Sequence, residues 1–80
     1  MTLLNIGYSN LVAVEHIIAV IAHDTAPAKR LVAEAKESGR LIDATCGKRT
    51  QSVIITDSDH VILSALSTDS LDRRASGAEE

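Results

Sequence analysis

Two adjacent cations, Lys48 and Arg49, follow Gly47 and are the residues in this sequence best suited to chemistry. Arginine offers a planar fork of N–H donors that fits a phosphate group, and lysine adds a compact positive charge. A basic pair of this kind in a loop predicts a phosphate contact. The alternative is an ordinary solvated loop tip, because basic pairs are common on protein surfaces.

The same segment lacks the pattern of a nucleoside triphosphate site. A P-loop requires a glycine five residues before its second glycine, and a serine or threonine directly after its lysine. Those two positions hold Ile42 and Arg49 instead. We therefore reject a triphosphate site.

Cys46 and the three histidines form no recognisable catalytic or metal-binding pattern. No spacing brings a base within reach of Cys46, so a buried or half-buried free thiol is expected, with a small hydrolase that uses this thiol as an alternative. The separations of His16, His23 and His60 match neither a helical i, i+4 pair nor a zinc finger. These residues therefore predict no catalytic thiol and no metal site.

The charge of the chain is unevenly distributed. Eight Lys and Arg against eleven Asp and Glu give a net charge of −3, which argues against nucleic-acid binding when taken alone. Up to Ile55, however, six basic residues stand against five acids, and beyond it two stand against six. The acid excess therefore belongs to the last third, and the remainder can still present a positive face.

The elements that must position these residues follow from apolar spacing. Four apolar residues at i, i+3, i+4 and i+7 predict one helix: Ala28, Leu31, Val32 and Ala35. Asp24 or Thr25 is expected to cap this helix, and Gly39 to end it. A short helix is expected over residues 68–74, with Thr68 or Asp69 as its cap. Strands are expected over residues 3–6, 16–22, 41–45, 53–56 and 61–66, the last two joined as a β-hairpin.

Together these elements predict an α+β fold, with a mostly antiparallel sheet of about five strands, one main helix and a short C-terminal helix. One domain is expected over residues 1–74, followed by a flexible acidic tail over residues 75–80. A single cysteine allows no internal disulfide, no apolar run approaches the roughly 20 residues that cross a bilayer, and residues 1–6 lack the basic start of a signal peptide. A cytoplasmic protein without membrane contact is therefore expected.

Four stretches, in this order and spacing, resemble the bacterial extracellular matrix regulatory (RemA) family: residues 5–10, 24–30, 41–50 and 53–64. The likeness runs without a gap from about Leu4 to Leu66. It implies a DNA-binding transcriptional regulator of extracellular-matrix or biofilm genes, associated with the nucleoid, that binds double-stranded DNA as a ring-shaped homo-oligomer. It implies no catalysis, no cofactor and no small-molecule substrate.

The resemblance also assigns DNA contacts to particular residues. Lys48 and Arg49 occupy the loop where family members carry two arginines, and they inherit the main contact role. His16 falls where the family has a basic residue before an apolar strand, and it is a weaker candidate. Lys29 and Arg30 are further weak candidates, with the alternative that they only keep an exposed helix soluble. Arg73 and Arg74 either assist the DNA face or cap the last helix through its dipole.

Assembly into an oligomer would increase the number of phosphate contacts with DNA. About two phosphate contacts per subunit are too few at cellular salt, because log K falls by about 0.9 per neutralised phosphate for each tenfold rise in salt. A ring multiplies the contacts through effective concentration. The apolar run 16–22 does not alternate, so it is either a strand buried on both faces or a strand that meets the next subunit head to tail. The alternative function is an oligomeric scaffold or protein-interaction module that does not bind DNA.

Overall fold

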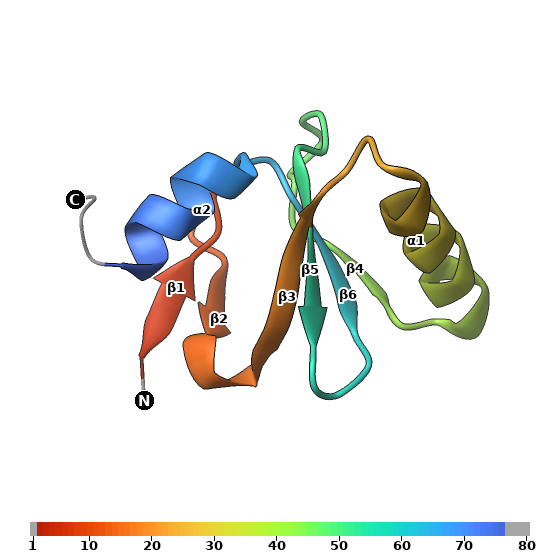
Figure 1. Ribbon diagram of the computed structural model, residues 1–80, viewed down its shortest axis with the longest axis horizontal. Coiled ribbons are helices and arrows are strands. Elements are labelled where there is room, and N and C mark those ends of the chain that lie inside the picture. Colours follow the sequence, from red (N-terminus) through yellow and green to blue (C-terminus); the bar gives the residue numbers. More distant parts are fainter. Residues whose placement is uncertain (1, 77–80) are drawn as a thin grey trace.

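The computed structural model describes residues 2–76, which form two sheets and two helices (Figure 1). In chain order the elements are β1 (Leu3–Asn5), β2 (Leu11–Ala13), a 3₁₀ turn (Val14–His16), β3 (Ile17–Ala22), α1 (Ala26–Ser38), β4 (Leu41–Asp43), β5 (Ser52–Thr56), β6 (Val61–Ser64) and α2 (Thr68–Ala75). Strands β1 and β2 pair with each other, and the other four follow the order β3-β5-β6-β4. The predicted α+β class is confirmed.

Most strand pairings are antiparallel, including the predicted hairpin of β5 and β6, while β4 lies parallel to β6. Residues 11–13 add a strand to those expected from the sequence. Strand β4 is shorter than expected because the Asp43 carboxylate accepts hydrogen bonds from both the backbone N–H and the hydroxyl of Thr45. These bonds turn the chain out of the sheet after Asp43.

Both helices begin with a hydroxyl cap. Thr25 caps α1, since its Oγ1 accepts a hydrogen bond from the N–H of Ala28, and Gly39 ends the helix in the left-handed region at φ 74°, as predicted. The cap predicted for α2 was wrong: Ser67, one residue earlier, keeps the extended backbone that a cap requires and accepts from the N–H of Ser70. Helix α2 ends at Ala75, and residues 77–80 of the predicted tail lie outside the described residues.

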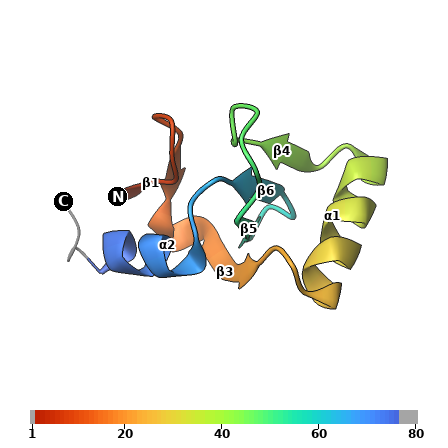
Figure 2. The same cartoon turned by 90° about the horizontal axis from the view of Figure 1, so that it is seen from above.

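The four-stranded sheet stands between α1 on one side and β1, β2 and α2 on the other (Figures 1 and 2). The α1 side has a small core of Ala28, Ala35, Val53 and Val61. The opposite side has a larger core of Leu4, Ile6, Ala44, Ile54, Ile62 and Leu71. Strand β5 contributes to both cores because successive side chains point to opposite faces.

Strand β3 is interrupted by a bulge. Ile17 lies opposite Thr56 and Ala19 opposite Ile55, so Ile18 is the extra residue, and this residue is 66% exposed. No residue of β3 is fully buried, which makes the prediction of a strand buried on both faces wrong. Within residues 2–76, no strand pairs with the outer edge of β3. A role at a subunit interface therefore stays a prediction.

Candidate nucleic-acid interface

The loop that carries Lys48 and Arg49 connects β4 to β5 and projects from one end of the sheet (green in Figure 1). Its base is fixed by the two bonds from Thr45 to the Asp43 carboxylate, at 3.0 and 2.6 Å, and these bonds hold the pKa of Asp43 below its usual range. The N–H of Lys48 then donates to the carbonyl of Thr45 at 3.0 Å and closes the turn. The first residues of the loop are therefore held in one conformation by hydrogen bonds.

The tip of this loop is a left-handed reversal. Cys46 and Gly47 have φ values of 54° and 81°, and a side chain at Gly47 would meet nothing within 4 Å, so the backbone angle alone requires the glycine. The reversal turns Cys46 outward, and the expectation of a buried or half-buried thiol was wrong. Lys48 and Arg49 are both exposed, and no carboxylate within residues 2–76 pairs with either.

A second turn supports the basic loop from the side. Asn10 follows the turn between β1 and β2, and its side-chain Nδ2 donates to the carbonyls of Gly7 at 2.9 Å and Ala44 at 3.1 Å. Gly7 takes a φ of 112°, and its N–H donates to the Asn5 side chain. Both asparagine side chains thus bond to loop backbone, and Asn10 ties the first turn to the start of the basic loop.

Lys29 and Arg30 lie at the same end of the sheet as the basic loop. Both are exposed on the first half of α1, which follows directly from the end of β3. The N–H of His23, just after β3, donates to the carbonyl of Gln51, just before β5, and so joins the two connections. Lys29 also lines a hollow together with Thr50, which belongs to the basic loop. The structure therefore places four candidate cations at one end of the molecule.

His16 lies at the other end of the sheet. Its ring Nδ1 is 3.0 Å from a carboxylate oxygen of Asp57, and its carbonyl accepts a hydrogen bond from the N–H of Asp57. The hydrogen bond and charge of Asp57, with a smaller contribution from Glu15, raise the pKa of His16 above 6.5. The length of β5 separates His16 from Lys48, so these two candidates do not share one patch.

The cations of α2 lie apart from the basic loop. Arg74 is half-buried, and its Nη1 donates to the carbonyl of Asn5 at 3.3 Å, so it joins the last turn of α2 to β1. Arg73 is exposed on the same turn. Arg74 therefore makes a structural contact with β1. Neither of the two roles predicted for Arg73 and Arg74, a DNA contact or a cap of the last helix, had included it.

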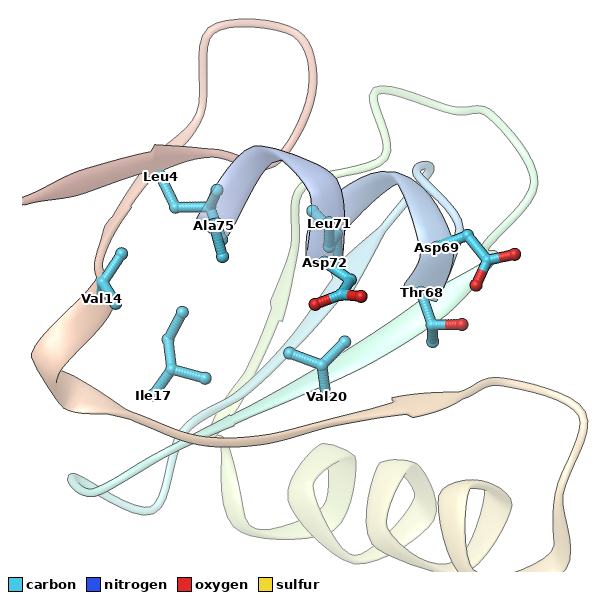
Figure 3. Close-up of a pocket in the computed structure, with 9 residues that line it drawn as sticks. All are labelled: Leu4, Val14, Ile17, Val20, Thr68, Asp69, Leu71, Asp72 and Ala75. Atoms are coloured by element: carbon cyan, nitrogen blue, oxygen red, sulfur yellow. The ribbon is translucent and has the colours of Figure 1, made fainter. Parts of the chain in front are cut away.

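An acid-rimmed hollow of about 500 Å³ lies beneath α2, on the face of the sheet opposite α1 (Figure 3). Its lining consists of Leu4, Val14, Ile17, Val20, Thr68, Asp69, Leu71, Asp72 and Ala75. Figure 3 shows the carboxylates of Asp69 and Asp72 on α2 above an apolar floor that includes Ile17 and Val20 of β3. A phosphate backbone would be repelled by this hollow, whereas an apolar surface would fit it.

Within residues 2–76, no group of three or more His, Cys, Asp or Glu side chains could hold a metal ion. None of the helices in that part of the chain is long and apolar enough to cross a membrane.

Known proteins resemble this chain over almost its whole length. It is 53% identical over 79 residues to a protein of Halothermothrix orenii, which covers 99% of this chain and 94% of the relative. It is 48% identical over 80 residues to a protein of Geobacillus thermodenitrificans, covering 100% and 92%. Both relatives are named for a regulatory role and nothing more specific. The class is therefore a small α+β regulatory protein, and the names point away from an enzyme.

The sequence profile of a family described as "Extracellular matrix regulatory protein A-like" matches residues 3–75. The chain belongs to this family, and the resemblance predicted from its four stretches is confirmed.

Proposed function

We propose that this protein is a transcriptional regulator that binds double-stranded DNA through the Lys48–Arg49 loop, repeated around a ring-shaped homo-oligomer. The observation that carries the proposal is the state of these two side chains: both are exposed on a braced turn, and no carboxylate within residues 2–76 neutralises them. The regulatory names of the relatives support the same function. Genes of the extracellular-matrix or biofilm type are its targets, and the nucleoid is its place of action.

The net charge of −3 does not oppose this function, because the acids are distributed unevenly. Asp57 and Asp59 lie in the hairpin turn beyond β5, and a five-residue strand spans about 17 Å. At 0.15 M ionic strength the Debye length is about 8 Å, so charges at the hairpin are largely screened from the basic loop. The closest acid along the chain, Asp43, is already bonded to Thr45.

Assembly uses the edge of β3 and the hollow beside it. The outer edge of β3 is unpaired within the described part of the chain, and Ile18 in its bulge is 66% exposed. Ile17 and Val20 continue this apolar surface into the hollow beneath α2. An unpaired apolar edge of this kind is a site for association, and a head-to-tail contact closes into a ring.

The test is a mobility-shift measurement with Arg49→Ala. We expect this variant to lose duplex binding while its elution volume in size-exclusion chromatography stays unchanged. Lys36→Ala is the matched control, because Lys36 is an exposed cation in the last turn of α1, which leads into β4 at the hairpin end of the sheet, opposite the basic loop. Retained binding by Arg49→Ala, or an equal loss in both variants, would refute the loop assignment.

The second candidate is an oligomeric scaffold that does not bind DNA. The pairing of His16 with Asp57 favours it, because this weaker DNA-contact candidate already has a partner within the fold. Affinity for a random duplex at low and at moderate salt separates the two functions. Binding at low salt that weakens steeply with added salt supports the regulator, and absence of binding at low salt supports the scaffold.

A further inference from the structure

A second hollow, of about 320 Å³, lies between α1 and the sheet, next to the basic loop. It is lined by His23, Lys29, Val32, Ala33, Thr50, Val53 and Leu63. Its volume falls at the lower end of the range of about 300–1,000 Å³ that is typical of small-molecule sites. We propose that this hollow binds a small organic anion that carries an apolar body.

The hollow has an apolar floor because α1 covers the sheet incompletely. Helix α1 lies over β4 and β6, and it packs through the small side chains of Ala28 and Ala35. Val53 is buried at the floor, whereas Val32 and Leu63 are only half-buried beside it. These aliphatic side chains provide a surface for a hydrocarbon group rather than for water.

Three polar side chains around this floor have hydrogen-bonding capacity to spare. The carbonyl of Gln51 can only accept, so the His23 Nδ1 that lies 3.1 Å from it donates, and Nε2 of the neutral ring is an acceptor with no hydrogen-bond partner within residues 2–76. The hydroxyl of Thr50 has no hydrogen-bond partner within residues 2–76. The ammonium of Lys29 has no carboxylate partner within that part of the chain. An anion is therefore offered two donors, the ammonium of Lys29 and the hydroxyl of Thr50, beside the imidazole of His23.

The chemistry of the lining selects an anion with a hydrocarbon body. No carboxylate lines the hollow, and the cations of the basic loop add to the positive field around it. A cationic or purely aliphatic ligand would leave Lys29 without a partner. A phosphodiester from DNA would satisfy Lys29 but would leave the floor of Val32, Val53 and Leu63 uncovered. A carboxylate with a short aliphatic chain satisfies both parts.

The test follows backbone amide signals by NMR while the full chain is titrated with hexanoate, without DNA. We expect saturable shifts at Lys29, Thr50 and Val53. Two probes separate the parts of the ligand: 1-hexanol has the chain without the charge, and inorganic phosphate has the charge without the chain. We expect both to bind about tenfold more weakly than hexanoate, since each forgoes either a charge-assisted bond or apolar burial.

Two variants test the site by different means. Lys29→Gln removes the cation and is expected to weaken hexanoate about tenfold, whereas Lys36→Gln, on the same helix but outside the lining, is expected to leave it unchanged. Ala33→Leu fills the hollow and is expected to block hexanoate without any change of charge. An absence of saturable shifts, equal binding of phosphate and hexanoate, or undiminished binding by Lys29→Gln would overturn the site.

Occupation of the hollow would also regulate DNA binding, and this consequence rests on the proposed function. The anion neutralises Lys29 and engages Thr50, which directly follows Arg49, so saturating hexanoate is expected to lower duplex affinity in wild type but not in Lys29→Gln. Hexanoate binding with unchanged duplex affinity would refute the regulation and leave the site standing. A protein that binds no duplex at all would refute the proposed function, while the NMR titration would still decide the site.

Discussion

The cations at the two ends of the four-stranded sheet differ in whether they have partners within the fold. At the hairpin end, His16 is paired with Asp57, and Arg40 donates to the hydroxyl of Ser38 and to a backbone carbonyl of the hairpin turn. At the loop end, Lys48 and Arg49 have no such carboxylate partner within residues 2–76. His16 and Arg40 are therefore engaged within the fold, whereas Lys48 and Arg49 remain available for a partner molecule.

The largest effect is expected from the residue that joins the two ends. Ile54 is fully buried in the middle of β5, and Ile54→Ala is expected to destabilise the fold by about 2–5 kcal/mol through lost burial and a cavity. Urea denaturation checks this, with Leu11→Ala as the control, because Leu11 is 55% exposed and its truncation is expected to change stability by about 0.5 kcal/mol. If amides of the loop end and the hairpin end unfold at different urea concentrations in the Ile54→Ala variant, the two ends do not form one cooperative unit.

Charge reversal at each end of the sheet tests whether the basic loop or the charge of the whole molecule governs duplex binding. Lys48→Glu is expected to lower duplex affinity more than about tenfold at 0.15 M salt, because it removes a contact that is repeated in every subunit. Asp57→Lys changes the charge by the same amount with the opposite sign, and we expect it to raise affinity less than about threefold, since screening limits its reach. Fluorescence anisotropy with a labelled duplex measures both. Comparable effects at the two ends would show that the whole-molecule charge, rather than the basic loop, governs binding.

Substitution of two glycines distinguishes a loss of stability through backbone strain from a loss of DNA binding through the shape of the basic loop. Gly47 and Gly39 have φ values of 81° and 74°, and neither would bring a new side chain within 4 Å of another group. Gly47→Ala and Gly39→Ala are therefore each expected to cost about 1–2 kcal/mol of stability by left-handed strain alone. Thermal unfolding should show similar losses, and only Gly47→Ala should also weaken duplex binding. Equal binding by the two variants would mean that the shape of the reversal does not matter.

The smallest effect is a pH dependence confined to the hairpin end. Because Asp57 raises the folded-state pKa of His16 above 6.5, the pair stabilises the fold fully below that value and loses its effect as the pH rises through the folded-state pKa. The difference in stability between wild type and Asp57→Asn should therefore be larger at pH 5.5 than at pH 8. An NMR titration of the His16 ring should show a lower pKa in the variant. A His16 pKa that is unchanged in Asp57→Asn would contradict the pairing.

Local chemistry in the sequence was sufficient for the main helix and the hairpin. The stripe of Ala28 to Ala35, the hydroxyl of Thr25 and the left-handed Gly39 act within one or two turns, and all three operate as predicted. The exposure of Lys48 and Arg49 could also be predicted, because Gly47 marks a reversal of the chain. Features set by neighbours in sequence could therefore be read directly.

Contacts between distant segments could not be predicted from the sequence in the same way. The partner of His16 lies 41 residues away, and the hydrogen bond from His23 to Gln51 crosses 28 residues, so no local pattern announces either. The hollow beneath α1 was missed for the same reason, since its polar side chains come from three separate segments. Its only signal in the sequence was the position of the hydroxyl of Thr50 next to the basic pair Lys48 and Arg49.

One buried hydroxyl has a consequence for how the chain acquires its structure. Ser64 donates to the carbonyl of Ile6, just after β1, at 2.8 Å and accepts from the N–H of Leu66, so the first strand is anchored by a residue 58 positions later in the chain. Leu71 of α2 completes the same core. During translation, the core that contains β1 is therefore completed only after residues 64–71 have left the ribosome, while α1 can already begin to form.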